Sequence, residues 1–242
     1  MTLSILLLQA RHADDAARDE ERSSFAAMTG LELDQVVSLD LLTKTPTLEE
    51  IREHSALMVG GSGAYYVTKG NLPGFPEVLA VLRQVVDVGH PTFASCFGFQ
   101  LLVEAMGGRV VYDPANMEVG TYNLSLTDAG RQDELFSYLP PTFKAQLGHK
   151  DKADRLPPGT LNLAASENAG LQALRVPDKP IWATQFHPEL TKEENLKRFN
   201  RYLDGYASLM SRDEIQETLA RFDHSPEANE LLVRFLSVVF GR

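Results

Sequence analysis

The sequence predicts an α/β fold in which a mostly parallel central β-sheet is covered by helices on both faces. Short apolar segments alternate with longer amphipathic segments through the first half of the chain. This alternation of strands and helices is typical of parallel sheets. In the second half, strand-like segments follow one another directly, which predicts a small mixed or antiparallel extension. Helical segments then close the chain.

The first half of the chain contains four expected strands, each identified as a short apolar run. The segment 14–28 is rich in Ala, Glu and Arg and predicts a helix. A capping box at residues 47–50 opens a short helix. Residues 75–88 have helical apolar spacing and stop at a glycine. A further helix follows Cys96 and ends near residues 107–108. The expected strands cover residues 4–8, 35–38, 56–59 and the apolar segment before Cys96.

The second half of the chain predicts five strands and then helices. A capping box at residues 191–194 opens a helix to about residue 209. Residues 211–242 predict two more helices, the last of which begins with Ser225 as N-cap and Pro226 at the first helical position. The expected strands cover residues 120–126, 143–147, 160–165, 171–176 and 181–186.

The last helix carries an apolar stripe, which either packs on the body of the same chain or forms a dimer or partner surface. We therefore expect a main domain over residues 1–209, with residues 210–242 as a helical extension packed on it. The stripe consists of Leu231, Leu232, Phe235, Leu236, Val239 and Phe240.

The composition is that of a globular protein with a sizeable core. The chain has 242 residues, of which 43% are hydrophobic and 23% are charged. Its net charge of −10 disfavours binding to nucleic acid or to an anionic membrane. The N-terminal apolar run is too short to span a bilayer and lacks the basic flank of a signal peptide. A single cysteine excludes an internal disulfide, so we expect a cytoplasmic protein.

That single cysteine, Cys96, lies where a reactive thiol would be placed. A short apolar run precedes it, small residues surround it, and a helical segment follows, which is the pattern of a strand–elbow–helix nucleophile. Ala94 and Gly98 leave room for the sharp turn, and the helix N-terminus favours a thiolate. The backbone N–H of Phe97 would face the oxygen of an attacked carbonyl. A free cysteine is otherwise most often a buried small hydrophobic residue.

A second donor for the same oxygen is expected in the glycine-rich segment 60–63, which follows a strand. The base is expected at His187, which follows the strand over residues 181–186. If that strand runs parallel to the one before Cys96, both residues lie at the same edge of the sheet. Glu189 can then accept a hydrogen bond from the imidazole and orient it. A lone histidine after a strand is otherwise more often structural than catalytic.

At these residues the chain resembles the class I, triad-type glutamine amidotransferases. That family carries a Gly-x-Cys-x-Gly-x-Gln elbow, and residues 94–100 match it with Ala94 in place of the first glycine. The Gln-Phe-His-Pro-Glu run at residues 185–189 resembles the family's triad end. A His-x-Asp segment at residues 149–151 is also similar. The resemblance covers roughly residues 4–209 and implies a flavodoxin-like three-layer sandwich.

The resemblance also implies roles for individual residues. Cys96 would attack a γ-carboxamide and form a γ-glutamyl thioester, with His187 as proton carrier and Glu189 as its orienting carboxylate. Phe97 and Gly61 would supply the oxyanion hole. Substrate binding would fall to Gln100 and Gly63.

No cofactor or metal is expected. The segment after Gly61 lacks the third glycine of a dinucleotide fingerprint, and no Lys-Ser/Thr pair follows a glycine loop. The six histidines are scattered, without a metal-binding pair at helical spacing. His149 is expected to be structural, while Asp151 would cap a turn or bind a substrate amino group.

The sequence thus predicts an enzyme that hydrolyses the γ-amide of glutamine or of γ-glutamyl compounds. No ATP-pyrophosphatase loop accompanies it, so it would act alone, as γ-glutamyl peptidases do, or feed ammonia to a separate synthetase subunit. The missing synthetase and Ala94 also fit a non-catalytic binding or regulatory protein on the same scaffold. A third alternative is a thiol hydrolase or stress protein of a related superfamily, but there a histidine usually follows the cysteine, where this chain has Phe97.

Overall fold

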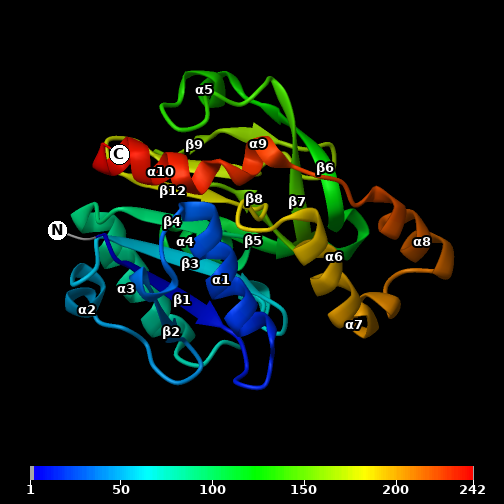
Figure 1. Ribbon diagram of the computed structural model, residues 1–242, viewed down its shortest axis with the longest axis horizontal. Helices are drawn as coiled ribbons and strands as arrows, with labels where there is room; N and C mark the ends of the chain where they lie inside the picture. The colour runs from blue at the N-terminus through cyan, green and yellow to red at the C-terminus, as the bar shows by residue number, and fades with distance from the viewer. Residues whose placement is uncertain (1–2, 242) are drawn as a thin grey trace.

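The computed structural model describes residues 3–241 and has three layers around a seven-stranded sheet (Figure 1). The five strands from β2 to β12 run parallel, and β11 and β9 follow at one edge, each antiparallel to the strand before it. The predicted α/β class with a mostly parallel sheet is therefore confirmed. The strand order is β2 (Val36–Asp40), β1 (Ile5–Ala10), β3 (Ala56–Ser62), β4 (Thr92–Ser95), β12 (Ile181–Thr184), β11 (Ala173–Val176) and β9 (Leu161–Asn162).

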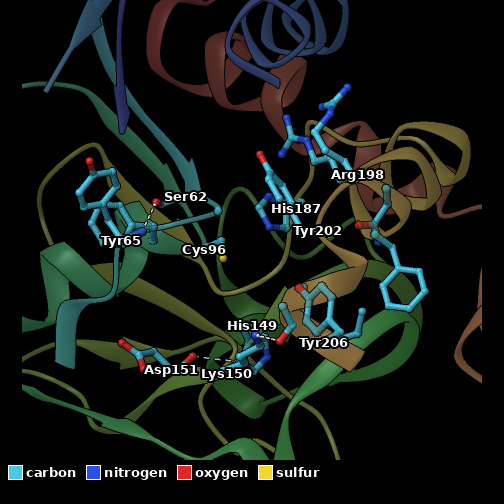
Figure 2. A pocket seen from close by; sticks show the side chains of 18 of the residues that line it. Ser62, Tyr65, Cys96, His149, Lys150, Asp151, His187, Arg198, Tyr202 and Tyr206 are labelled. Atoms are coloured by element: carbon cyan, nitrogen blue, oxygen red, sulfur yellow. Dashed lines mark hydrogen bonds between the residues drawn. The ribbon is translucent and has the colours of Figure 1, made fainter. Parts of the chain in front are cut away.

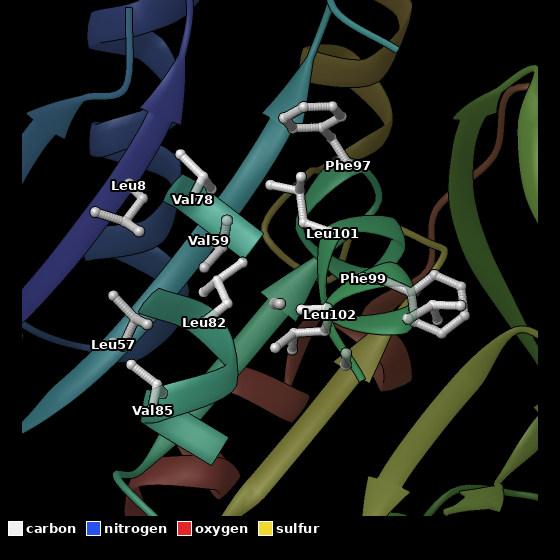
Figure 3. Packing of buried hydrophobic residues seen from close by; sticks show 14 of the residues in the cluster. Leu8, Leu57, Val59, Val78, Leu82, Val85, Phe97, Phe99, Leu101 and Leu102 are labelled. Carbon is white, nitrogen blue, oxygen red and sulfur yellow. The ribbon is translucent and has the colours of Figure 1, made fainter. Parts of the chain in front are cut away.

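Helices cover both faces of this sheet because side chains alternate between the faces of each strand. Leu6 and Leu8 of β1 join one apolar cluster, whereas Ile5 and Leu7 join the other. The first cluster includes α3 (Phe75–Val88) and α4 (Phe97–Ala105), whose apolar side chains pack on β3 (Figure 3). A short helix, α2 (Leu48–Arg52), begins at the expected capping box. The second cluster includes α1 (Ala17–Thr29) and α10 (Leu231–Phe240).

The predicted mixed or antiparallel extension is only partly separate: the strands expected over residues 171–176 and 181–186 join the main sheet as β11 and β12, and two small sheets lie beside it. One contains β10 (Ala164–Ala165), β6 (Glu118–Leu126) and β7 (Thr142–His149), and the other pairs β5 (Arg109–Tyr112) with β8 (Asp151–Arg155). The single strand expected over residues 160–165 is wrong, because β9 pairs with the main sheet and β10 with β6. No strand was expected at β5 or β8, because this ribbon buries few apolar side chains and so has little hydrophobic pattern.

The C-terminal helices differ in detail from the prediction. The helix expected to run to residue 209 divides at Tyr202 into α6 (Lys192–Arg201) and α7 (Leu203–Ala207). It is followed by α8 (Arg212–Arg221), α9 (Pro226–Asn229) and α10. Ser225 precedes α9, but its side chain makes no capping hydrogen bond and instead accepts one from Gln146 Nε2 at 3.0 Å. A short α5 (Asp128–Gln132) and three 3₁₀ turns (Leu33–Gln35, Val67–Lys69 and Pro114–Asn116) complete the elements.

The apolar stripe of α10 packs on the body of the chain. The ring of Phe235 is fully buried and lies edge-on to Phe93 of β4 and Trp182 of β12, with centroids 5.7 and 5.9 Å away. In Figure 1, α10 lies over the same face of the sheet as α1. The division at residue 209 stays a prediction. Within residues 3–241, no helix is both long and apolar enough to cross a membrane.

Candidate active site

A strained elbow carries Cys96 between β4 and α4. Its backbone has φ 52° and ψ −102°, a left-handed conformation that costs a non-glycine residue roughly 1–3 kcal/mol. The turn is held because the Cys96 N–H donates to Thr184 O at 2.7 Å and the Cys96 carbonyl accepts from Gln100 N at 3.1 Å. Cys96 is only 5% exposed but lines a cavity of about 320 Å³. The sulfur is therefore accessible from one side alone.

The small residues around the elbow have different roles. A Cβ added to Gly98 would lie 2.5 Å from the carbonyl oxygen of Val59, so only glycine fits there. Ala94 is an ordinary strand residue, paired with Val59 on one side and Ala183 on the other. Its methyl group belongs to the apolar cluster beneath α4. The alanine that departs from the family's elbow pattern is thus accommodated without a left-handed backbone.

His187 lies at the same edge of the sheet as Cys96. Strand β12 is parallel to β4, with Thr184 opposite Ser95, so both strands end together. The pairing of Cys96 with His187 was expected only if their two strands run parallel, and this condition is met. The His187 backbone N–H donates to Gln146 O at 2.9 Å, which fixes the turn after the strand. Figure 2 shows the imidazole beside Cys96, at the wall of the cavity that both residues line.

Glu189 holds the imidazole from behind. Its Oε1 lies 2.6 Å from His187 Nδ1, and its side chain is fully buried. Burial works to lower the pKa of His187, but the charge of Glu189 and the adjacent Cys96 outweigh it and raise that pKa to about 10. The ring is therefore held as an imidazolium near neutral pH, next to a sulfur.

A buried ion network extends from Glu189. Arg198 on α6 places Nη1 3.8 Å from Glu189 Oε1 and Nη2 3.7 Å from Glu21 Oε1. Arg11 binds the same Glu21 with two hydrogen bonds, of 3.1 and 2.8 Å. Burial favours the neutral forms, yet the two arginines keep the pKa of Glu21 below its usual value. Two buried cations and two buried anions are thus paired behind His187.

The glycine-rich segment continues β3 and passes directly beneath His187. A Cβ at Gly61 would lie 2.8 Å from His187 Cε1, and one at Gly60 would lie 2.8 Å from the Glu21 carboxyl carbon. The N–H of Gly61 donates to Glu21 Oε1 at 3.2 Å. Phe97 begins α4, and the first N–H groups of a helix have no partner within that helix.

The residues expected to bind substrate both line the cavity, in different ways. The amide nitrogen of Gln100 donates to Asp151 O at 2.7 Å and to Gln185 Oε1 at 3.1 Å, so its two hydrogens are taken. Gly63 lies under the ring of Tyr202. The carboxylate of Asp151 accepts from the backbone and hydroxyl of Thr68 and ties a 3₁₀ turn to β8. That supports the capping role considered for Asp151.

His149 is structural in the sense expected. Its Nε2 lies 3.0 Å from Glu118 Oε2 and its Nδ1 lies 3.1 Å from Asp151 O. Glu118 and His149 are opposite each other on β6 and β7, so the pair links these strands at the wall of the cavity that His149 lines. Among residues 3–241, no group of His, Cys, Asp or Glu is arranged to hold a metal ion.

Several cavity residues were missed by sequence analysis. They come from the end of β1 and from the α6–α7 region, far from the elbow in sequence, and no motif marks them. The Thr191 capping box indicates where α6 begins but not which of its side chains face the cavity. The missed lining residues include Arg11, Arg198, Arg201, Tyr202 and Tyr206.

Comparison with known proteins extends these observations. Residues 31–202 match the family model described as glutamine amidotransferase class-I. Over 164 residues the chain is 30% identical to a protein of Sulfolobus acidocaldarius that is named as one subunit of a glutamine-hydrolyzing GMP synthase, covering 67% of this chain and 82% of that one. It is 31% identical over 153 residues to the glutamine-hydrolyzing GMP synthase of Thermosipho africanus, a match that covers 63% of this chain. The match spans only 28% of that longer relative.

Solved structures show the same fold over nearly the whole chain. A glutamine amidotransferase from Thermotoga maritima superposes with a TM-score of 0.69 at 18% identity, covering 98% of this chain and 97% of that one. A glutamine amidotransferase from Methylobacillus flagellatus gives the same TM-score at 21% identity, covering 98% and 95%. These likenesses confirm the predicted three-layer architecture.

Proposed function

The chain belongs to the class-I glutamine amidotransferases, a family of glutamine-hydrolysing enzymes, and on this premise we propose that it hydrolyses the γ-amide of glutamine or of γ-glutamyl compounds with Cys96 as nucleophile. The observation that carries the proposal is the alignment of Cys96, His187 and Glu189 at one edge of the sheet, where Cys96 and His187 line one cavity and Glu189 is bound to His187 from behind. A cysteine at a helix N-terminus beside an imidazolium is the arrangement that favours a thiolate.

The proposed reaction has two stages. The sulfur of Cys96 attacks the γ-carbonyl carbon, and the π electrons of the carbonyl move onto its oxygen. As the tetrahedral adduct collapses, the carbon–nitrogen bond breaks and His187 gives its proton to the leaving nitrogen. Water then attacks the thioester, His187 takes a proton from that water, and glutamate leaves as the carbon–sulfur bond breaks. In both stages Glu189 accepts the hydrogen bond from Nδ1 of His187, which keeps the ring in one tautomer when it is neutral and stabilises its positive charge when it is protonated.

The oxyanion would be stabilised by two backbone N–H groups. Phe97 N, at the start of α4, is one of them. The other is proposed at Gly61, whose N–H already contacts Glu21 Oε1. That N–H would have to leave Glu21, which Arg11 also binds, before it could donate to an oxyanion. In the same proposal, Gln100 lines the site where the glutamyl group lies, and Gly63 would contact the substrate on the side of the cavity that Tyr202 covers.

A second form of this function is donation of ammonia to a separate synthetase. It is favoured by the relatives that are named as one subunit of GMP synthase, of which the Sulfolobus protein is matched over most of its length. We place the enzyme in the cytoplasm, where a reducing environment keeps a lone cysteine free.

Ammonia release from glutamine tests the proposal directly. Purified full-length chain should release ammonia and glutamate in a coupled glutamate-dehydrogenase assay. Cys96→Ser should reduce the rate by roughly 10⁴-fold or more while retaining the far-ultraviolet circular dichroism of the wild type. A wild type inactive on glutamine and on a panel of γ-glutamyl amides, with and without a synthetase, would favour a binding protein on this scaffold instead.

A further inference from the structure

His187 defines which side of the cavity receives the leaving nitrogen, because its imidazolium has to protonate that nitrogen. Gly61 lies against His187, and a Cβ at Gly61 would lie 3.6 Å from Arg11 Nη2. Arg11 therefore borders the same side. Asp151, whose carbonyl accepts from Gln100, lies on the other side of Cys96 (Figure 2). The leaving group thus faces His187 and Arg11, and the rest of the substrate faces Gln100.

Tyr202 closes the side that receives the leaving group. It lies at the junction of α6 and α7 and lines the same cavity as His187 (Figure 2). Its hydroxyl accepts from Arg11 Nη1 at 3.0 Å and donates to Asp15 Oδ2 at 2.5 Å. Tyr202 is therefore fixed at its hydroxyl, which makes two hydrogen bonds, and at its backbone, whose N–H donates to the carbonyl of Arg198 near the end of α6.

The ring of Tyr202 also packs against the glycine-rich loop. A Cβ at Gly63 would lie 2.7 Å from Tyr202 Cζ, so the ring occupies the space that any side chain at residue 63 would need. Tyr202 therefore connects the α6–α7 side of the cavity with the glycine-rich loop at Gly63. On that side of the cavity a leaving group larger than ammonia would compete with the ring for space, and displacing the ring would break both hydrogen bonds of the hydroxyl.

We propose that Tyr202 is a specificity-determining residue that restricts the leaving group to ammonia, so that the substrate class is the primary γ-amide and not an N-substituted γ-glutamyl amide. This inference rests on the proposed function and narrows it. A pocket that fits its substrate distinguishes one extra or missing methylene group by roughly 10–200-fold in kcat/KM. Even the smallest N-substituent should therefore be disfavoured.

The test compares L-glutamine with γ-glutamyl methylamide, which adds one methyl group to the leaving nitrogen. Glutamate formation is measured for the wild type, Tyr202→Ala and Tyr202→Phe. The wild type should prefer glutamine by about 10-fold or more in kcat/KM. Tyr202→Ala should reduce that preference by about 10-fold, mainly by raising kcat/KM for the methylamide. Tyr202→Phe retains the ring and should keep most of the preference.

Tyr206→Ala is the matched control, because it removes an equal side chain from the same cavity. The Tyr206 hydroxyl lies 3.8 Å from where a Cβ of Gly148 would be, near the end of β7, and its ring lies under Lys150 Nζ at 4.5 Å. Its substitution should leave the ratio between the two substrates unchanged, whatever it does to both rates.

Two results would overturn the inference. One is a wild type that hydrolyses the methylamide as well as glutamine, a measurement that needs no variant to fold. The other is a Tyr202→Ala protein in which the kcat/KM values for both substrates change by the same factor. Absence of Cys96-dependent hydrolysis of either substrate is a different outcome, which would overturn the proposed function itself.

Discussion

The Nδ1 atom of His187 lies 2.6 Å from Oε1 of the fully buried Glu189. Because a carboxylate only accepts hydrogen bonds, this contact places a proton on Nδ1 and leaves Nε2 for the side of the ring that faces the cavity. Arg198 lies behind the same carboxylate, 3.8 Å away, and limits the cost of its burial. Glu189 therefore fixes the orientation of the His187 ring, and Arg198 helps to keep Glu189 negatively charged.

The first prediction concerns the pH dependence of activity. The pKa of His187 is raised to about 10, so the imidazolium that protonates the leaving nitrogen is lost as the pH rises through that value. The kcat/KM profile should therefore fall at high pH. Glu189→Gln removes a charge that raises this pKa, so the fall should move to lower pH by about 1–3 units. Glu193→Gln, on the exposed side of α6, is the control and should not move it. A high-pH limb unchanged in Glu189→Gln would contradict this account of His187.

A second prediction concerns the close contact beneath the elbow. Gly98→Ala should destabilise the protein by about 1–3 kcal/mol, because its Cβ would meet the Val59 carbonyl at 2.5 Å and backbone cannot rotate away. Urea unfolding measures the change. Gly170→Ala is the control, since nothing lies within 4 Å of its Cβ position, and its free energy of unfolding should stay close to that of the wild type. Equal stability of the two variants would argue against the tight elbow.

The third prediction concerns the alanine that replaces the family's first elbow glycine. Ala94→Gly should cost about 1 kcal/mol in the free energy of unfolding, because it removes a buried methyl group and adds backbone freedom within a strand. Activity on glutamine should stay within about two-fold, because Ala94 already has a strand backbone. A gain of ten-fold or more would mean that the methyl group strains the turn.

The fourth prediction concerns the C-terminal helices, which we propose to be an extension packed on the main domain. Phe235→Ala should destabilise the whole protein by about 3–5 kcal/mol, because the ring is buried against Phe93 and Trp182. Val233→Ala on the same helix is 42% exposed and should have a small effect. A separate, earlier unfolding transition in Phe235→Ala would indicate that the extension unfolds independently.

Much of the architecture was predictable because its strands are buried on both faces. The continuous apolar runs at β1, β3 and β12 indicate strands that helices cover, and the residues after them mark one edge of the sheet. That is why Cys96 and His187 could be paired from sequence, although 91 positions separate them. Parallel strand direction was the one condition that only the structure could supply.

The remaining features depend on contacts that leave no local pattern. Glu21 resembles any charge on an exposed helix face in sequence, yet it is fully buried by Arg11 and the glycine loop. Arg198 and Tyr202 reach the cavity only because α6 packs against β6 and β7. Strands β5 and β8 pair with each other and bury only Val110 and Ala153 among their apolar side chains, so burial constrains little of their composition.

The most direct test of the central claim is to trap the enzyme during turnover and find where the substrate is attached. The wild type is mixed with glutamine, quenched in acid within the first turnovers, and digested for mass spectrometry. We predict a glutamyl adduct on the peptide that contains Cys96, present in greater amount in Glu189→Gln if thioester hydrolysis is slowed, and absent in Cys96→Ser. An enzyme that releases ammonia from glutamine with no adduct at Cys96, or with full activity in Cys96→Ser, would contradict the account.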